Sequence, residues 1–179
     1  RIADQNIPVT AILGDQQAAL YAQCGRTKDT VKNTYGTGMF VMANTGDTCM
    51  QDERLISTIA IATKNSRDYA VEGSIFMGGA AIQWLRDQVK LIDHAKDSEA
   101  IATSITDNKG LYLVPAFTGL GAPHWDADAR GILTGITRDT GRAEIVRATL
   151  ESLAYQSQDV IQVIQDYPLP VKSIRADGG

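Results

Sequence analysis

A run of four strand-forming segments between Val31 and Gly73 limits the folds open to this chain more than any other feature of its sequence. Each segment is rich in β-branched or aromatic residues, and short turn-forming stretches separate it from the next. The segments cover residues 31–35, 39–43, 55–63 and 68–73. We expect the first two to form a hairpin around Gly36-Thr37-Gly38, and the other two to flank the turn-like sequence KNSR. A β-sheet is therefore predicted at the centre of the fold.

The pattern then changes from the strand period to the helical period. Ile82, Leu85, Val89 and Ile92 fall on one helical face, which predicts an amphipathic helix. Further helices are expected over about 97–106 and 142–166, and further strands in LYLVP, GILTGIT and VKSIRA. At the start of the chain, residues 7–13 are a candidate buried strand, and a short helix is expected to end at Gly25. Strands followed by alternating helices and strands predict a layered α/β fold.

Composition excludes several classes of function. The chain has 179 residues, 44% of them hydrophobic, and a net charge of −4. This acidic balance argues against a nucleic-acid partner. No apolar run is long enough to span a bilayer, and no segment resembles a signal peptide. The two cysteines, Cys24 and Cys49, suggest neither a disulfide framework nor a metal site. We therefore expect a protein of the reducing cytoplasm. A start at Arg1 and an end in RADGG lead us to expect a fragment of a longer protein.

Three glycine-bearing junctions are candidate phosphate sites. They are Gly36-Thr37-Gly38 in the hairpin turn, Gly78-Gly79-Ala80-Ala81 at a helix start, and Gly178-Gly179 after the last strand. Backbone N–H groups are often free at such junctions and can hold phosphate oxygens. The alternative is purely structural, because glycine also serves turns that need positive φ and helices that pack closely on a sheet. Gln83 lies one turn after Gly79 and is either a ligand contact or a solvated surface residue.

Asp15 is the candidate catalytic carboxylate. It follows Gly14 at a predicted strand end and opens a helix, which is where ligands collect in open α/β sheets. It would act there as a general base or a substrate anchor, and Gln16 beside it offers a donor and an acceptor suited to a polyol. The structural alternative is that Asp15 is only a helix N-cap. His94 and His124 lack metal-ligand spacing, and we interpret them as structural.

Seven segments occur in the order and approximate spacing seen in the glycerol kinases, a branch of the FGGY carbohydrate kinases. They are GDQQAAL, NTYGTGMF, EGSIFMGGAAIQWLRD, VPAFTGLGAPHWD, RGILTGITRDT, RATLESLAYQ and ADGG. The chain resembles this family over nearly its whole length. The Gly-Asp, Gly-Thr and Asp-Gly-Gly elements are common to FGGY kinases, whereas DQQAAL, NTYGTG and AFTGLGAPHWD resemble the glycerol branch in particular.

The resemblance implies a ribonuclease H-like fold of the actin-like ATPase superfamily, in a two-lobed kinase with ATP in the cleft. Residues 1–25 would be the C-terminal end of the first FGGY lobe and residues 26–179 most of the second. The implied reaction is Mg²⁺-assisted, ATP-dependent phosphorylation of glycerol to sn-glycerol 3-phosphate. The family also implies a cytoplasmic enzyme that forms homo-oligomers at full length.

Site residues are implied position by position. Asp15 matches the base that takes the proton from the attacking glycerol hydroxyl, Gln16 a glycerol ligand, and Phe40 an apolar wall beside the glycerol carbons. The nucleotide contacts are matched by Thr37 at the phosphates, by Gly79 and Gln83 at the helix start, and by Gly179 in the adenosine motif. The resemblance implies no metal ligand in this chain, because the Mg²⁺-associated aspartate belongs to the first lobe.

Two other functions remain open at this stage. One is a different FGGY sugar kinase, such as one acting on a pentulose, since most discriminating contacts lie in the first lobe. The other is a non-catalytic, actin-like nucleotide-binding module. The presence of Asp15 argues against the second, because such a module needs no base.

Overall fold

The structure is a computed structural model that describes residues 8–178. Its elements, in chain order, are α1 (Asp15–Cys24), β1 (Thr30–Tyr35), β2 (Met39–Gly46), β3 (Ile56–Ala62), β4 (Arg67–Ile75), α2 (Gly79–Asp87), α3 (Asp97–Thr103), β5 (Tyr112–Val114), β6 (Ile132–Thr134), α4 (Arg142–Gln165) and β7 (Ser173–Gly178). The α/β fold predicted from the sequence is confirmed.

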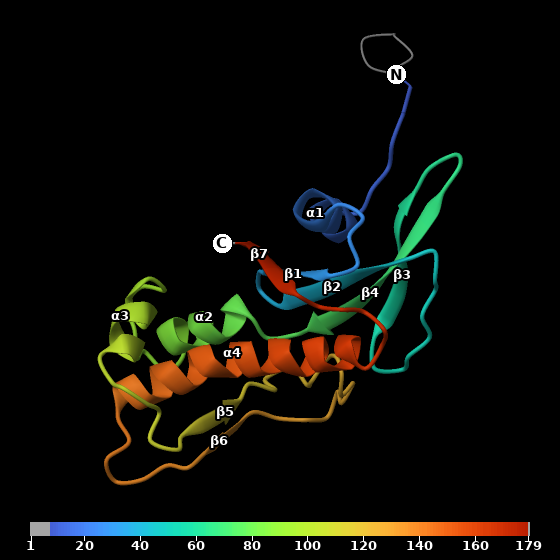
Figure 1. Cartoon of the computed structure of the whole chain (residues 1–179). Coiled ribbons are helices and arrows are strands. Elements are labelled where there is room, and N and C mark those ends of the chain that lie inside the picture. Colours follow the sequence, from blue (N-terminus) through green and yellow to red (C-terminus); the bar gives the residue numbers. More distant parts are fainter. Residues whose placement is uncertain (1–7, 179) are drawn as a thin grey trace.

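A five-stranded sheet in the order β3-β4-β2-β1-β7 forms the centre of the fold. The first four strands pair antiparallel, and β7 joins the edge of β1 in parallel. Figure 1 shows α1 on one face of this sheet and the long helix α4 on the other, with α2 and α3 beyond one end. A crossover of this kind, which returns a late strand to lie beside an early one, requires the long intervening segment that α4 provides.

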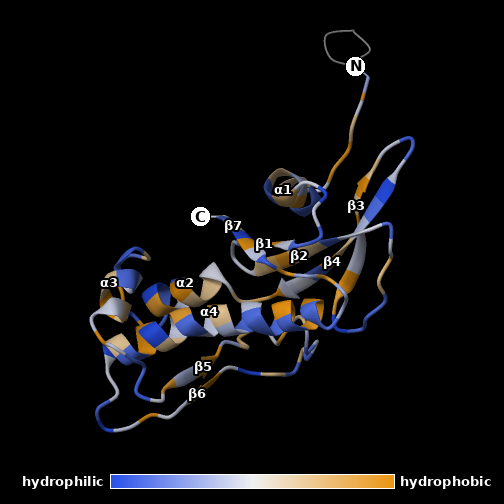
Figure 2. Ribbon diagram, viewed as in Figure 1, coloured by the Kyte–Doolittle hydropathy of each residue, from blue (hydrophilic) through white to orange (hydrophobic). Residues whose placement is uncertain are grey.

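Alternation along the strands divides the side chains between the two faces. The face toward α4 carries most of the main core, including Val31, Val41 and Val71, and apolar residues recur along the strands and α4 in Figure 2. Gly73 allows α4 to approach closely, because a Cβ atom there would lie 2.3 Å from a methyl carbon of Val160. A side chain at position 73 would push the helix away from the sheet.

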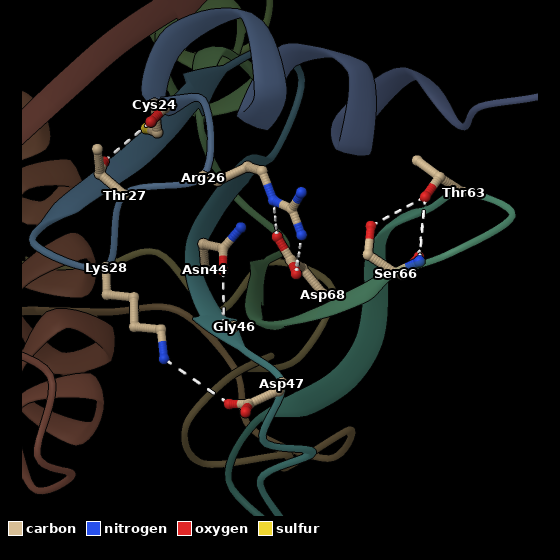
Figure 3. Close-up of polar contacts among 10 residues, drawn as sticks. All are labelled: Cys24, Arg26, Thr27, Lys28, Asn44, Gly46, Asp47, Thr63, Ser66 and Asp68. Atoms are coloured by element: carbon tan, nitrogen blue, oxygen red, sulfur yellow. Dashed lines mark hydrogen bonds and ion pairs between the residues drawn. The ribbon is translucent and has the colours of Figure 1, made fainter.

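The opposite face is covered by α1. Leu20 and Cys24 of α1 pack on Met42, Ala60 and Ala70 of the sheet. Just after the helix, the guanidinium of Arg26 donates two hydrogen bonds to the carboxylate of Asp68 on β4 (Figure 3). This paired contact holds the pKa of Asp68 below its usual value, mainly through the hydrogen bond itself. The helix is thereby fixed to the sheet at its C-terminal end.

The predicted strands and helices from residue 15 onward are present, with one notable difference. The apolar stripe from Ile82 to Ile92 predicts a longer helix than α2, which ends at Asp87. Lys90 adopts a left-handed conformation with φ of 56°, and the Leu91 N–H donates to the Leu85 carbonyl at 2.8 Å. This hydrogen bond ends the helix, and Ile92 still packs in the core beside Leu85.

The predicted buried strand over residues 7–13 is wrong for the part that the structure describes. Residues 8–13 form no strand, and Val9, Ile12 and Leu13 are all exposed. Their apolar character indicated a strand, but none of the sheet strands in the described part of the chain pairs with them. Residue 7 itself lies outside the described residues.

Candidate functional site

Asp15 is the first residue of α1, and its side chain is exposed. The N-cap is Gly14, whose extended backbone precedes the helix, so the interpretation of Asp15 as an N-cap is wrong. Asp15 Oδ1 accepts the N–H of Gln16 at 2.8 Å, a contact that orients the carboxylate at the helix start. A carboxylate at this end of a helix is stabilised in its charged form by the backbone dipoles.

Gln16 lies half-buried between α1 and the sheet, and its partner is a residue that the sequence analysis did not single out. The amide oxygen Oε1 accepts a hydrogen bond from Lys32 Nζ of β1 at 2.5 Å. Lys32 Nζ also donates to Thr34 Oγ1 at 2.6 Å, and the Thr34 hydroxyl donates to Asp177 of β7. A polar network thus runs beneath α1 from its first turn to the end of β7. The alternation of side chains along a strand places Lys32 and Thr34 on one face of the sheet. This was the only feature of the sequence from which the network could have been predicted.

Phe40 belongs to the same face of the sheet. It pairs with Thr34 across the β1–β2 ladder and with Ser74 across β2–β4. Directly paired residues project to the same side of a sheet, so Phe40 lies on the side that α1 covers. The long loop 114–131 reaches this strand end, where the Ala122 N–H donates to the Ser74 carbonyl at 2.8 Å. The structure therefore brings Asp15, Gln16 and Phe40 to one side of the sheet.

Thr37 lies at the exposed tip of the β1–β2 turn, and the turn is joined directly to the start of α2. The Thr37 carbonyl accepts the N–H groups of Gly78 and Ala80 at 2.9 and 3.1 Å, and the Gly36 carbonyl accepts that of Gly79 at 2.8 Å. These helix N–H groups are consequently not free for a ligand, contrary to our expectation from the glycine-rich helix start. Among residues 8–178, no hydrogen bond occupies the N–H or the hydroxyl of Thr37 itself.

The glycines at this junction serve close backbone approach. Neither Gly36 nor Gly38 has positive φ, so the structural alternative that this turn needs glycine for a left-handed conformation is wrong. Instead, a Cβ on Gly38 would lie 2.5 Å from the Ile75 carbonyl oxygen, and one on Gly79 would lie 2.9 Å from the Gly36 carbonyl oxygen. A side chain at position 38 would push the turn away from the end of β4, and one at position 79 would separate the turn from α2.

Gln83 follows one turn along α2 and is exposed, at the rim of a shallow hollow of 230 Å³. At the other side of the turn, β7 ends against β1, where Gly178 pairs with Tyr35. Gly178 has φ of 106°, and a Cβ there would lie 2.0 Å from the Tyr35 carbonyl oxygen, so only glycine fits. Gly179, predicted to contact the adenosine, lies outside the described residues.

The site therefore has two parts joined by β1. The acceptor part contains Asp15, Gln16 and Phe40, and the turn part contains Thr37, Gly79 and Gln83. Within residues 8–178, no group of three or more His, Cys, Asp or Glu side chains could hold a metal ion. None of the helices in that part of the chain is long and apolar enough to cross a membrane.

A separate cavity of 260 Å³ lies between β5 and α4, lined by residues that include Tyr112, Tyr155 and His124. It contains none of the predicted site residues. His124 Nε2 lies 3.8 Å from a carboxylate oxygen of Asp159, and the Trp125 indole contacts Phe76, with the two ring centroids 6.3 Å apart. These residues are part of the packing around the long loop.

The central sheet with helices on both faces, and the hairpin turn joined to a helix start, agree with the fold of the actin-like ATPases. Residues 31–179 match the C-terminal domain of the FGGY family of carbohydrate kinases. The chain belongs to this family.

Individual relatives share much of the sequence. The chain is 53% identical over 175 residues to a glycerol kinase of Symbiobacterium thermophilum and 50% identical to one of Clostridium perfringens. Each match covers 97% of this chain, and the chain spans 35% of the length of these curated relatives. A crystal structure of Plasmodium falciparum glycerol kinase with ADP superposes with a TM-score of 0.86 at 37% identity, over 97% of this chain and 35% of that one. A xylulose kinase of Lactobacillus acidophilus superposes with a TM-score of 0.74 at 26% identity, over 86% of this chain and 31% of that one.

Proposed function

We propose that the chain is part of an ATP-dependent kinase that phosphorylates glycerol to sn-glycerol 3-phosphate. The observation that carries this proposal is the identity of 50–53% to proteins named glycerol kinase, along 97% of the chain. Two structurally similar proteins that are named for other substrates, the xylulose and gluconate kinases of Lactobacillus acidophilus, are 26% identical to the chain. The side-chain chemistry of the site is consistent with a small polyol.

In the acceptor part, Asp15 would accept the proton of the attacking hydroxyl. Its Oδ1 is oriented by the Gln16 N–H, and among the described residues no hydrogen bond occupies Oδ2, which leaves that oxygen for a ligand. Gln16 would bind a glycerol hydroxyl, and the half-buried ring of Phe40 would cover the carbon chain. Phosphoryl transfer depends mainly on positioning, so a carboxylate that stays ionised can serve as the base.

In the turn part, Thr37 would hold ATP phosphates through its hydroxyl and its N–H. Gly79 would position the turn against α2, and Gln83 with Gly179 would contact the nucleoside. When ATP is bound, Mg²⁺ would supply positive charge that reduces the negative charge of the phosphates. We assign no Mg²⁺ ligand to this chain, because the family resemblance assigns the Mg²⁺-associated aspartate to the first lobe.

The remaining assignments extend this proposal to the whole protein. We propose that residues 1–25 end the first lobe and residues 26–179 belong to the second, and that the full-length enzyme is a cytoplasmic homo-oligomer. Cys24 and Cys49 are both free, which is compatible with a reducing compartment. The packing of α1 on the sheet is compatible with a helix at the junction between lobes.

A panel of acceptors tests the proposal. The full-length protein is assayed with Mg-ATP and, in turn, with glycerol, a ketopentose and gluconate. The phosphorylated product is identified by its chemical shift in phosphorus NMR. We expect glycerol to give the highest kcat/KM. A preference for the ketopentose would reject glycerol in favour of another sugar kinase activity, and absence of turnover with every acceptor would favour the non-catalytic module.

A further inference from the structure

Lys32 has the most unusual environment of any charged residue in the described part of the chain. It lies in the middle of β1, paired with Met42, and its side chain is 0% exposed. Its neighbours on this face are largely apolar, with Leu20, Cys24 and Ala70 in the same layer. Lysine is almost never fully buried in this way unless its charge is paired.

The contacts of Lys32 do not include a direct ion pair. Within residues 8–178, no carboxylate lies within 4.0 Å of Nζ, and its two acceptors are the neutral oxygens of Gln16 and Thr34, at 2.5 and 2.6 Å. Burial lowers the pKa of Lys32, and the negative charges of Asp177, Glu72 and Asp15 oppose this effect. A methionine of similar length would fill the space without the cost of burying a charge. Packing therefore does not explain the ammonium group.

The direction of these hydrogen bonds determines what Gln16 can offer to a ligand. An ammonium group has only donors, so it must contact the amide oxygen of Gln16 and not the amide nitrogen. Gln16 Oε1 is thereby occupied, and Nε2 with its two hydrogens is the end left for a ligand. The same contact fixes the first turn of α1 to β1, and this turn includes Asp15.

We propose that Lys32 is a positioning residue of the acceptor site: it holds the Gln16 amide so that its NH₂ group faces the polyol, and it fixes the α1 start that carries Asp15. This inference rests on the proposed function and assigns the role to a residue that makes no contact with the substrate itself. Thr34 completes the arrangement by receiving a second hydrogen bond from Lys32 and donating its own to Asp177.

The test compares Lys32→Met with Arg26→Met in the full-length protein. Both variants remove a cation that links α1 to the sheet, but Arg26 contacts Asp68 on β4, away from Gln16. We expect Lys32→Met to raise the KM for glycerol about tenfold or more, because a hydrogen bond from a charged donor is lost, and to leave the KM for ATP within about twofold. Arg26→Met is expected to lower the melting temperature and leave both KM values unchanged.

A double variant then tests whether Lys32 acts through Gln16. In a Gln16→Ala background, Lys32→Met should raise the glycerol KM no further, whereas additive effects would reject the proposed route. If Lys32→Met does not fold, Gln16→Glu tests the orientation that Lys32 is proposed to impose on Gln16, because it keeps an acceptor for Lys32 but replaces the ligand-facing donor with an oxygen. It should raise the glycerol KM selectively.

Several results would overturn the inference. They are a glycerol KM within twofold of wild type in folded Lys32→Met, equal rises in both KM values, and an unchanged glycerol KM in Gln16→Glu. Failure of the proposed function has a different signature, since the wild-type protein would then fail to phosphorylate glycerol at all.

Discussion

At the scale of single residues, Asp15 is available to a ligand because the helix does not need its side chain as a cap. Gly14 is the N-cap, and the Asp15 carboxylate contacts only the adjacent N–H among the described residues. The sequence alone left the two roles open, because both place an aspartate at a helix start. The backbone conformation of Gly14 removes the capping role and leaves the base as the proposed one.

Asp15→Asn in the full-length protein should separate stability from turnover. The amide keeps an oxygen for the Gln16 N–H and loses only the charge at the helix start, so the free energy of unfolding should fall by less than about 1 kcal/mol. Loss of a positioned base should lower kcat by on the order of 10²–10⁴. Melting temperature and kcat are measured on the same preparation, with the exposed Asp47 changed to Asn as the control. A large loss of stability with kcat retained would exclude Asp15 from the mechanism.

Thr37 should affect the nucleotide more than the acceptor. Its hydroxyl is exposed at the turn, so Thr37→Ala should cost little stability but remove a hydrogen bond to phosphate worth about 1.5–3 kcal/mol. We expect kcat/KM for ATP to fall at least about tenfold while the KM for glycerol changes little. Thr37→Ser should restore most of the loss, and Thr63→Ala in the β3–β4 turn serves as the control. Unchanged kinetics with ATP in Thr37→Ala would contradict the phosphate role.

At the scale of elements, the junction between the β1–β2 turn and α2 shows what the sequence could and could not predict. Glycines at residues 36, 38, 78 and 79 predicted two special sites, and both elements formed where expected. The sequence did not reveal that the turn carbonyls accept the helix N–H groups, because this contact joins segments about forty residues apart. Among residues 8–178, the N–H of Thr37 therefore stays free at the turn, whereas the N–H groups of Gly78, Gly79 and Ala80 are occupied.

The same limit explains why the burial of Lys32 was not predicted from the sequence. Strand alternation places it on the face of Thr34, but a lysine in a hairpin is normally solvated, and the sequence gives no sign that α1 covers this face. The prediction of a buried strand was wrong for residues 8–13 for the opposite reason. Its apolar residues predicted burial, yet no neighbouring strand in the described part of the chain receives them. In both cases burial depends on which element packs against the segment, and periodicity does not carry that information.

The start of α4 should contribute a pH-dependent part of the stability. Glu144 accepts hydrogen bonds from Lys109 Nζ at 2.6 Å and from the Gly141 N–H at 2.9 Å. The first of these is the main reason that the pKa of Glu144 falls from 4.5 to about 2. A lowered pKa in the folded state gives stability that is fully present above about pH 4.5 and is lost as the pH falls toward 2.

Glu144→Gln removes this titration. The melting temperature of the full-length variant should be lower than that of wild type near neutral pH, and the difference should shrink between pH 4.5 and 2. Calorimetry across this range checks the prediction, with Glu53→Gln as an exposed control that should follow the wild type. A difference that stays constant with pH would show that Glu144 contributes through its shape and not through its charge.

At the scale of the whole molecule, the residues of the proposed acceptor site lie on a surface that is left open in the described part of the chain. Asp15 is exposed, Phe40 is only half-buried, and the apolar residues Val9 and Ile12 are exposed in the segment that precedes Asp15. The chain spans 35% of the length of its curated relatives. A phosphoryl-transfer site needs both sides of its cleft, because closure of the cleft positions the reactants and excludes water.

A polypeptide of these 179 residues alone should therefore show no measurable glycerol kinase activity. Asp15 and Thr37 would still be present, but nothing would hold glycerol in line with the terminal phosphate of ATP, and positioning supplies most of the rate in this chemistry. Purified polypeptide is assayed with glycerol and Mg-ATP, and Asp15→Asn polypeptide purified in parallel serves as the control for contaminating enzyme. Turnover in the wild-type preparation that is absent from the Asp15→Asn preparation would contradict the prediction, since it would mean that one side of the cleft positions both substrates by itself.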